Sequence, residues 1–293
     1  MITIRQLLEK KQKREPIVML TAYDYPMARL VAAAGVDMIL VGDSGGMTQL
    51  GYPTTLPVTM DEMITMVRAV RRGAPDTFII GDMPFLSYQT SVETAIANAG
   101  RLVKEGGADA VKLEGGKRMA NTARAIVDAG IALQGHVGLT PQNATQLSGY
   151  RAQGRDELSA NGFVEDCRLL QDAGAFSLIF ECVPARLATA VTEALDIPSI
   201  GTGSGSGCSG QNLITPDILG LCDIVHPRYV KKYADVGSVI AAALAQYRTE
   251  VLTAVFPTEE NTYAVKGPWF DALIDRVSRE GLSGGPSATS PPS

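Results

Sequence analysis

Short apolar runs alternate with longer amphipathic stretches along most of the chain. The apolar runs predict eight β-strands, at 17–20, 38–41, 78–80, 110–113, 131–133, 178–180, 199–200 and 223–225. Between them, apolar positions three or four residues apart predict helices, at 25–34, 60–72, 92–105, 119–129, 164–173 and 185–195. Several of these helices run into glycine, which is typical of a left-handed residue after the last helical turn.

This alternation predicts parallel strands joined by right-handed helical crossovers. Eight such units favour a closed (β/α)₈ TIM barrel over an open sheet, although periodicity alone does not separate the two. An open doubly wound sheet binds its ligand where the strand order reverses, whereas a barrel gathers functional groups at the carboxyl ends of its strands. The position of the polar residues therefore discriminates between the two folds.

The composition changes near residue 262 of the 293-residue chain. Residues 264–279 predict one further amphipathic helix, and residues 281–293 are rich in Gly, Ser and Pro, which predicts a disordered tail. We therefore expect a catalytic barrel over residues 1–262 and a C-terminal extension over residues 263–293.

Charge and composition exclude several classes of function. The formal net charge of −5 offers no broad basic surface for a nucleic acid. No apolar run approaches the roughly 20 residues that cross a bilayer, and the first residues lack the apolar centre of a signal peptide. The four cysteines form neither a C-x-x-C pair nor a zinc-binding spacing, so we expect reduced, unpaired thiols. These features favour a cytoplasmic enzyme.

Polar residues follow or end five consecutive predicted strands. They are Asp43 and Ser44 after the second strand, Asp82 after the third, Lys112 and Glu114 on the fourth, His136 after the fifth and Glu181 after the sixth. Because the carboxyl ends of barrel strands meet on one face, this pattern predicts a single active site.

Carboxylates that share a pocket repel one another unless a cation lies between them. Oxygen donors without a set of three Cys or His favour Mg²⁺ over zinc, and Mg²⁺ commonly takes only one or two protein carboxylates. Asp43 and Asp82 suit direct ligation, and Glu114 suits contact through water. Such a metal would polarise a carbonyl group and acidify the adjacent C–H, which leaves Glu181 as the candidate base.

Each of these residues also has a structural interpretation. Asp43 could cap the helix that follows it, and Asp82 could stabilise a turn. Lys112 and Glu114 are two residues apart, so they face the same side of a strand and could form an ion pair. His136 could be a buried histidine with satisfied hydrogen bonds.

The glycine-rich run at 201–210 follows the seventh predicted strand. Glycines permit close approach to a ligand, and barrels often bind phosphate after strands seven and eight. A flexible loop that binds no phosphate is an equal interpretation. Cys208 has no neighbouring His in the sequence, so it gives only weak evidence for a nucleophile. Cys182, next to Glu181, is expected to face the opposite side of the strand and pack there.

At these residues the sequence resembles the ketopantoate hydroxymethyltransferase family, over roughly residues 3–257. The matching motifs are TAYD at 21–24, VGDS at 41–44, TLPVT at 55–59, RRGAP at 71–75, DMPF at 82–85, VKLEGG at 111–116, GHVGLTPQ at 135–142, QGR at 153–155 and ECVP at 181–184. The resemblance implies a barrel of the phosphoenolpyruvate mutase and isocitrate lyase superfamily, Mg²⁺ as cofactor, and a large homo-oligomer, a decamer. It also implies transfer of a one-carbon unit from methylene-tetrahydrofolate to 3-methyl-2-oxobutanoate, giving 2-dehydropantoate.

The resemblance assigns a role to each candidate residue. Asp43 and Asp82 would bind Mg²⁺, with Glu114 holding a metal-bound water. Ser44, Lys112 and His136 would contact the α-keto acid, and Glu181 would remove the proton from its β-carbon. These assignments agree with the chemistry that the residue types indicate.

The chain departs from the family pattern in a few places. Residues 201–205 read Gly-Thr-Gly-Ser-Gly where the family usually has Gly-Ile-Gly-Ala-Gly, Ser209 and Pro53 stand where Asp is common, and residues 261–263 read Asn-Thr-Tyr instead of His-Ser-Phe. One alternative is therefore a divergent member that hydroxymethylates another α-keto acid. A carbon–carbon lyase of the same superfamily is a second alternative, although the chain lacks the Lys-Lys-Cys-Gly-His-type loop of those enzymes. A non-catalytic scaffold is a third.

Overall fold

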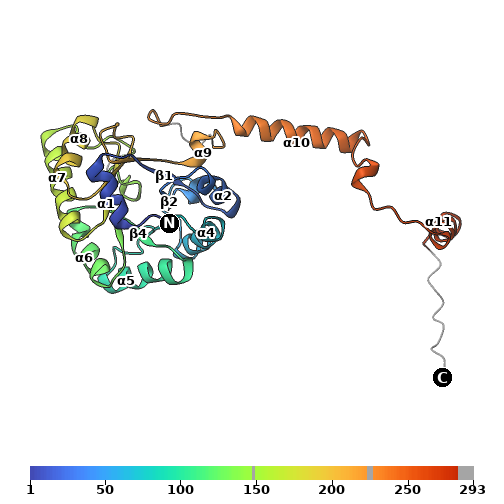
Figure 1. Ribbon diagram of the computed structural model, residues 1–293, viewed down its shortest axis with the longest axis horizontal. Helices are drawn as coiled ribbons and strands as arrows, with labels where there is room; N and C mark the ends of the chain where they lie inside the picture. Colours follow the sequence, from blue (N-terminus) through green and yellow to red (C-terminus); the bar gives the residue numbers. More distant parts are fainter. Residues whose placement is uncertain (147–148, 223–226, 283–293) are drawn as a thin grey trace, which may run out of the picture. The chain divides into compact units, whose positions relative to one another are not determined.

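The computed structural model describes residues 1–146, 149–222 and 227–282. Eight parallel strands close into a barrel in the order β1 to β8, with β8 paired to β1 (Figure 1). The strands are β1 Ile17–Thr21, β2 Met38–Val41, β3 Phe78–Asp82, β4 Ala110–Glu114, β5 Leu133–Gly138, β6 Ser177–Glu181, β7 Ser199–Thr202 and β8 Gly210–Leu213. The predicted (β/α)₈ fold class is confirmed.

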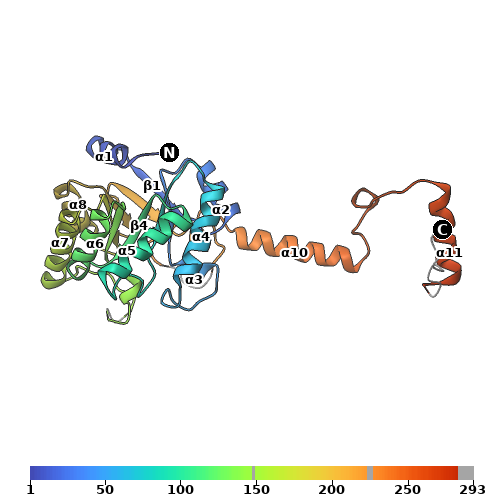
Figure 2. The ribbon, with the colours of Figure 1, turned by 90° about the horizontal axis from the view of Figure 1, so that it is seen from below.

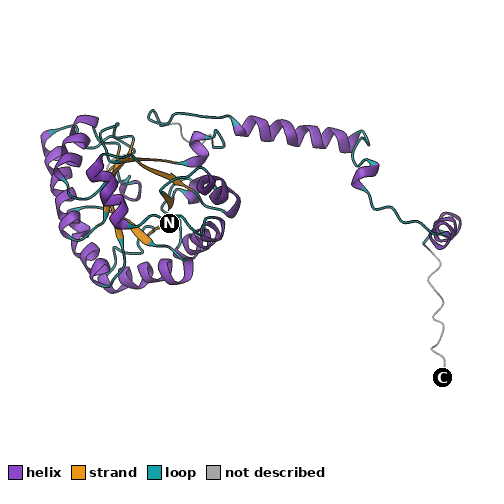
Figure 3. Cartoon of the chain, viewed as in Figure 1, coloured by secondary structure: helices purple, strands orange, loops and turns teal. Residues whose placement is uncertain are grey.

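Helices surround this sheet, as the purple ribbons of Figure 3 show. They are α1 Ile4–Lys13, α2 Tyr25–Ala33, α3 Gly45–Thr48, α4 Met60–Gly73, α5 Val92–Arg101, a π-helical turn at Leu102–Gly106, short 3₁₀ turns at Lys117–Met119 and Pro141–Asn143, α6 Ala120–Asp128, α7 Glu157–Asp172, α8 Ala185–Ala194 and α9 Thr215–Ile218. The six predicted helices are all present. Helix α7 begins earlier than predicted, because Asp156 caps it by accepting a hydrogen bond from the backbone N–H of Ser159.

Two strand predictions were wrong. The fifth strand was expected at 131–133, but β5 starts at Leu133 and continues through Gln134 and His136. The eighth strand was expected at 223–225, which lies outside the described residues; the eighth strand of the closed barrel is β8 at Gly210–Leu213. Both strands carry buried polar side chains that face the barrel interior, so neither sequence shows the apolar run that the predictions required.

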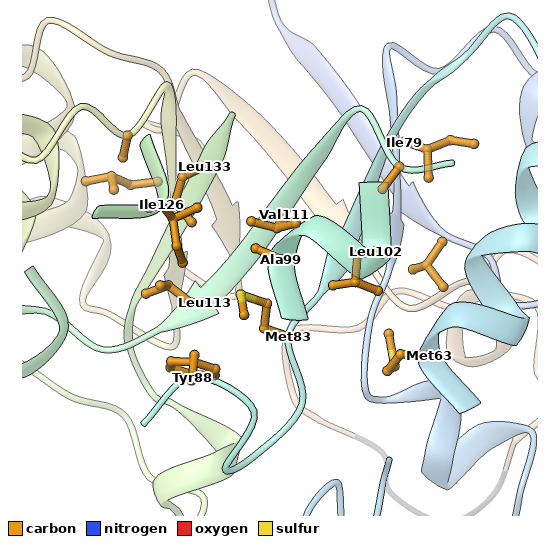
Figure 4. Packing of buried hydrophobic residues seen from close by; sticks show 14 of the residues in the cluster. Met63, Ile79, Met83, Tyr88, Ala99, Leu102, Val111, Leu113, Ile126 and Leu133 are labelled. Atoms are coloured by element: carbon orange, nitrogen blue, oxygen red, sulfur yellow. The ribbon is translucent and has the colours of Figure 1, made fainter. Parts of the chain in front are cut away.

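Alternation along each strand separates an outer core from an inner one. On β4, Val111 and Leu113 point outward and pack against the surrounding helices, where Leu102 and Ile126 lie (Figure 4). The alternate residues of the same strand, Lys112 and its neighbours two positions away, therefore face the barrel interior. This alternation places the charged residues of β4 inside a fully buried strand.

The barrel interior is apolar toward the amino ends of the strands. The inner cluster contains Met19, Met38, Phe78 and Ile200, and Leu7 of α1 packs against it. In Figure 2, α1 lies at one end of the barrel and α3 at the other. The amino end is therefore filled and covered, which leaves the carboxyl end for a ligand.

The chain divides into two compact units, residues 1–237 and residues 238–293. The second contains most of α10 (Val236–Leu252), a 3₁₀ turn at Glu259–Asn261 and α11 (Pro268–Glu280). The sequence-based boundary at residue 262 lies within the second unit, and α10 contains no buried residue. The predicted helix at 264–279 corresponds to α11, and the predicted tail lies mostly outside the described residues. Within the described ranges, no helix is long and apolar enough to cross a membrane.

Candidate active site

A cavity of about 410 Å³ opens at the carboxyl ends of the strands. Its lining includes all the site residues predicted from the sequence, which are Asp43, Ser44, Asp82, Lys112, Glu114, His136 and Glu181. The structure therefore brings together side chains from the ends of five strands, as the strand-end pattern predicted.

Strand register explains why these side chains meet. Asp82 on β3 is paired with Lys112 on β4, and Glu114 on β4 is paired with His136 on β5. Paired residues on neighbouring parallel strands lie at the same height and face the same side of the sheet. These two pairs, which share β4 and lie two residues apart along it, form a polar layer across the barrel mouth, above the apolar interior.

Lys112 is the cationic centre of this layer. Its ammonium Nζ lies 2.7 Å from both carboxylate oxygens of Asp82 and 3.5 Å from Oε1 of Glu114. Burial lowers the pKa of Lys112, but the charges of Asp82, Glu114 and Asp43 outweigh this and raise it above its ordinary value. The predicted structural pair of Lys112 with Glu114 exists, but the shorter contact is to Asp82.

Asp43 is buried beside other negative charges. Its backbone N–H donates a 3.2 Å hydrogen bond to Oδ2 of Asp82. Burial, with the charges of Asp82 and Glu114, raises the pKa of Asp43 well above its usual value. Asp43 does not cap α3, because the cap position is Ser44, and the Ser44 hydroxyl lies 2.8 Å from the phenol oxygen of Tyr23.

Gln142 joins two of the carboxylates and was not assigned to the site from the sequence. Its side-chain Nε2 donates to Oδ2 of Asp43 at 2.9 Å, and its backbone N–H donates to Oε2 of Glu114 at 3.0 Å. The phenol of Tyr88 donates to Oε1 of Gln142 at 2.7 Å and accepts from the backbone N–H of Glu114 at 3.0 Å. Gln142 lies within a recognised motif, whereas no pattern in the sequence marks Tyr88.

His136 lies between two carboxylates. Its Nδ1 is 3.4 Å from Glu114 and its Nε2 is 3.2 Å from Oε2 of Glu181, although neither nitrogen makes a well-aligned hydrogen bond within the described ranges. Burial and Lys112 lower the pKa of His136, but Glu114 and Glu181 outweigh them and raise it to about 9. The raised pKa favours the protonated imidazole, which lies between the two carboxylates.

The donor set suits a hard divalent cation. Four carboxylates, those of Asp43, Asp82, Glu114 and Glu181, surround two cationic side chains, so the layer has an excess of negative charge. No three His, Cys, Asp or Glu side chains in the described part of the chain converge to hold a metal by themselves. A cation here would therefore take few protein ligands and complete its shell with oxygens of substrate and water, as Mg²⁺ commonly does.

The glycine-rich run connects β7 to β8, and its glycines allow neighbouring side chains to pack closely against it. Gly203 and Gly205 have positive φ angles of +68° and +84°, and a Cβ at either would collide with Tyr229 or Ala185. Of residues 201–210, only Thr202 lines the cavity. Cys182 also lines it, contrary to the prediction, because its φ of +50° ends the strand alternation directly after Glu181.

Solved structures similar to this fold define its class. A phosphonopyruvate hydrolase in complex with oxalate and Mg²⁺ aligns with a TM-score of 0.58 at 12% identity, covering 96% of this chain and all of that one. A 2,3-dimethylmalate lyase, named as a member of the phosphoenolpyruvate mutase and isocitrate lyase superfamily, aligns with a TM-score of 0.56 at 15% identity over 97% of this chain and 100% of that chain. The chain therefore shares the barrel fold of these two enzymes.

Sequence comparison identifies the family within this class. The family model of ketopantoate hydroxymethyltransferase matches residues 1–259. The 3-methyl-2-oxobutanoate hydroxymethyltransferase of Moorella thermoacetica is 53% identical over 89% of this chain and 97% of its own length, and that of Heliobacterium modesticaldum is 52% identical over 90% and 96%. The chain belongs to the ketopantoate hydroxymethyltransferase family and is an enzyme of the hydroxymethyltransferase class. Family membership disfavours the lyase and scaffold alternatives.

Proposed function

We propose that the protein transfers a hydroxymethyl group from methylene-tetrahydrofolate to 3-methyl-2-oxobutanoate, giving 2-dehydropantoate for pantothenate biosynthesis. The observation that carries this proposal is the buried layer of carboxylates around Lys112 in a chain of this family. The cavity is large enough for a small keto acid together with part of a second ligand.

The cationic side chains bind and orient the keto acid. Lys112 and protonated His136 offset the negative charge of its carboxylate and of the enolate that forms from it. The Ser44 hydroxyl, held by Tyr23, supplies a neutral hydrogen-bond donor at the same end of the cavity. Burial strengthens each of these interactions because water competes poorly inside the cavity.

Asp43 and Asp82 would hold Mg²⁺, with Glu114 contacting it through water. The bound ion would polarise the keto group and so acidify the adjacent C–H. Gln142 fixes the orientation of Asp43 and Glu114 before any ligand arrives. The raised pKa of Asp43 supports this assignment, because an ionised carboxylate in that position needs a nearby positive charge.

Glu181 is the base that removes the β-proton. Its side chain is 15% exposed, whereas those of Asp82 and Glu114 are 1% exposed, so it reaches the open part of the cavity. The carbanion formed on the β-carbon attacks the methylene carbon of the folate and a C–C bond forms. Both bonds from that carbon to folate nitrogens break, water supplies the hydroxyl oxygen, and the two nitrogens take up the β-proton and one proton of that water. His136, 3.2 Å from Glu181, helps to orient the carboxylate of the base.

We further propose a cytoplasmic homo-oligomer, with the decamer as the expected assembly. Helix α10 supports self-association, because it contains no buried residue and exposes Val239, Leu244, Tyr247 and Leu252. Exposed apolar surface of this extent is typical of a protein interface.

The test is an assay of the full chain with Mg²⁺, methylene-tetrahydrofolate and a panel of α-keto acids, followed by mass spectrometry. We expect a mass gain of one hydroxymethyl group on 3-methyl-2-oxobutanoate. Folded protein that converts no member of the panel would contradict the proposal, and conversion of a different member only would reassign the keto acid.

A further inference from the structure

Two polar side chains meet at the carboxyl ends of β7 and β8. The Nδ2 of Asn212 donates a hydrogen bond of 3.3 Å to Oγ1 of Thr202. Both residues are buried, with Asn212 only 5% exposed, and both line the site cavity. Neither was assigned to the site from the sequence, and Thr202 stands where the family usually has Ile.

The second polar atom of the Asn212 amide is unpaired. Within residues 1–146, 149–222 and 227–282, its Oδ1 is shielded from solvent and has no hydrogen-bond partner. The residues beside the pair on the inner face, Met19 and Ile200, belong to the apolar inner core. A buried amide oxygen without a donor destabilises a fold, so its position on a ligand cavity indicates that a ligand supplies the donor.

Strand order shows which part of a keto acid would reach this pair. Thr202 is paired in register with Glu181, the proposed base, so the pair lies next to the atom that loses its proton. The anion-binding Lys112 and Asp82 lie on β4 and β3, across the barrel from β8 and β7. A keto acid with its carboxylate toward Lys112 and its β-carbon at Glu181 therefore extends its β-substituents toward Asn212.

We propose that Asn212 and Thr202 form a polar subsite that binds a hydroxyl group carried next to the β-carbon of the α-keto acid. This inference rests on the proposed function. Oδ1 of Asn212 accepts the hydroxyl hydrogen, and the Thr202 hydroxyl, which is both donor and acceptor, completes the site. The hydroxymethyl group that the reaction adds is a hydroxyl of this kind, whereas the methyl groups of the unreacted keto acid leave Oδ1 unpaired.

The test compares two ligands that differ by one hydroxyl group, 2-dehydropantoate and 3,3-dimethyl-2-oxobutanoate, by titration calorimetry with Mg²⁺ and without folate. Neither ligand has a β-proton for Glu181 to remove. We expect the wild-type protein to bind the hydroxylated ligand about tenfold more tightly, and Asn212→Val to remove this preference. Thr202→Val should reduce the preference by a smaller factor.

Gln134 provides a matched control. It is a buried amide inside the barrel whose Oε1 also lacks a partner in the described residues, but it does not line the cavity. Gln134→Met should keep the tenfold preference. Thermal unfolding of every variant separates loss of the hydroxyl contact from loss of folding, and Thr202→Val decides the question if Asn212→Val does not fold.

Exchange of the β-proton of 3-methyl-2-oxobutanoate with deuterated water tests the proposed function separately. Two results would overturn the subsite: equal affinity of the wild type for the two ligands, or an unchanged preference in Asn212→Val. If the wild type exchanges the β-proton in either case, the proposed function still stands. A wild type that neither exchanges the proton nor binds either ligand overturns both.

Discussion

The ammonium of Lys112 lies 2.7 Å from both carboxylate oxygens of Asp82, its register partner on the neighbouring strand, and both side chains are almost completely buried. Removing one member of a buried ion pair leaves the other charge without compensation, whereas removing both can be nearly neutral. The pair therefore offers a way to separate stability from activity.

We expect Lys112→Met to lower the free energy of unfolding by about 3 kcal/mol, measured by urea titration. The double variant Asp82→Asn/Lys112→Met should recover most of this loss in stability. It should remain inactive, because it lacks the ammonium that binds the keto acid and one of the carboxylates that would bind Mg²⁺. Additive destabilisation in the double variant would show that the two side chains are not energetically coupled.

Replacing the base should abolish proton removal without affecting metal binding. We expect Glu181→Gln to slow exchange of the substrate β-proton with deuterated water by about 10²-fold or more, because a positioned base contributes on that scale. Mg²⁺ affinity should stay near that of the wild type. The exposed Glu165, which pairs with Lys117, is the control, and Glu165→Gln should exchange at the normal rate. Normal exchange by Glu181→Gln would remove Glu181 from this role.

Asp43 should have opposite effects on stability with and without metal. Its pKa is raised in the folded protein by burial and by Asp82 and Glu114, so the folded state binds a proton more tightly than the unfolded state. In metal-free protein, the contribution of Asp43 to stability therefore falls as the pH rises above about 3.9 and through the raised folded value.

Asp43→Asn removes that penalty, so we expect the metal-free variant to be more stable than the wild type at pH 7. Excess Mg²⁺, at 100 times its dissociation constant, should stabilise the wild type by about 2.7 kcal/mol and the variant much less. Thermal unfolding with and without EDTA measures both effects. Asp172→Asn, which alters an exposed ion pair, is the control; equal stabilisation of Asp43→Asn and wild type by Mg²⁺ would exclude Asp43 as a ligand.

Gln142 positions two carboxylates at once, so its loss should weaken the metal site without removing a ligand. We expect Gln142→Leu to reduce Mg²⁺ affinity by about 10- to 100-fold, the usual range for residues that orient metal ligands. Asn143, the next residue, bonds locally to Thr140, and Asn143→Ala should bind Mg²⁺ normally. Unchanged affinity in Gln142→Leu would mean that Asp43 and Glu114 are held by other contacts.

The contrast between Gln142 and the predicted residues shows what the sequence could reveal. Charged side chains at strand ends are visible because apolar runs mark the strands, so Asp43, Asp82, Lys112 and Glu181 were all predicted to meet, and they do. The role of Gln142 depends on the path of the loop after β5, which periodicity does not describe.

The misplaced eighth strand has a related cause. β8 has the sequence Gly-Gln-Asn-Leu, in which Gln211 faces solvent and Asn212 faces the cavity. Two of its four residues are therefore polar, and no apolar run identifies the strand. Similarly, the left-handed backbone of Cys182 reverses the side expected from strand alternation. In both cases the prediction from the hydrophobic pattern was wrong at residues that line the cavity and do not pack in the apolar core.

Helix α10 should be an assembly surface. It contains no buried residue, yet Val239, Leu244, Tyr247 and Leu252 are 57–69% exposed. An apolar side chain that a partner copy covers contributes to association, and a charge there would have to be desolvated on binding. We therefore expect Leu244→Glu to shift the protein to smaller species in size-exclusion chromatography with light scattering. Gln246→Ala, on the same helix, should leave the assembly intact, and a monomeric wild type would contradict the role of α10.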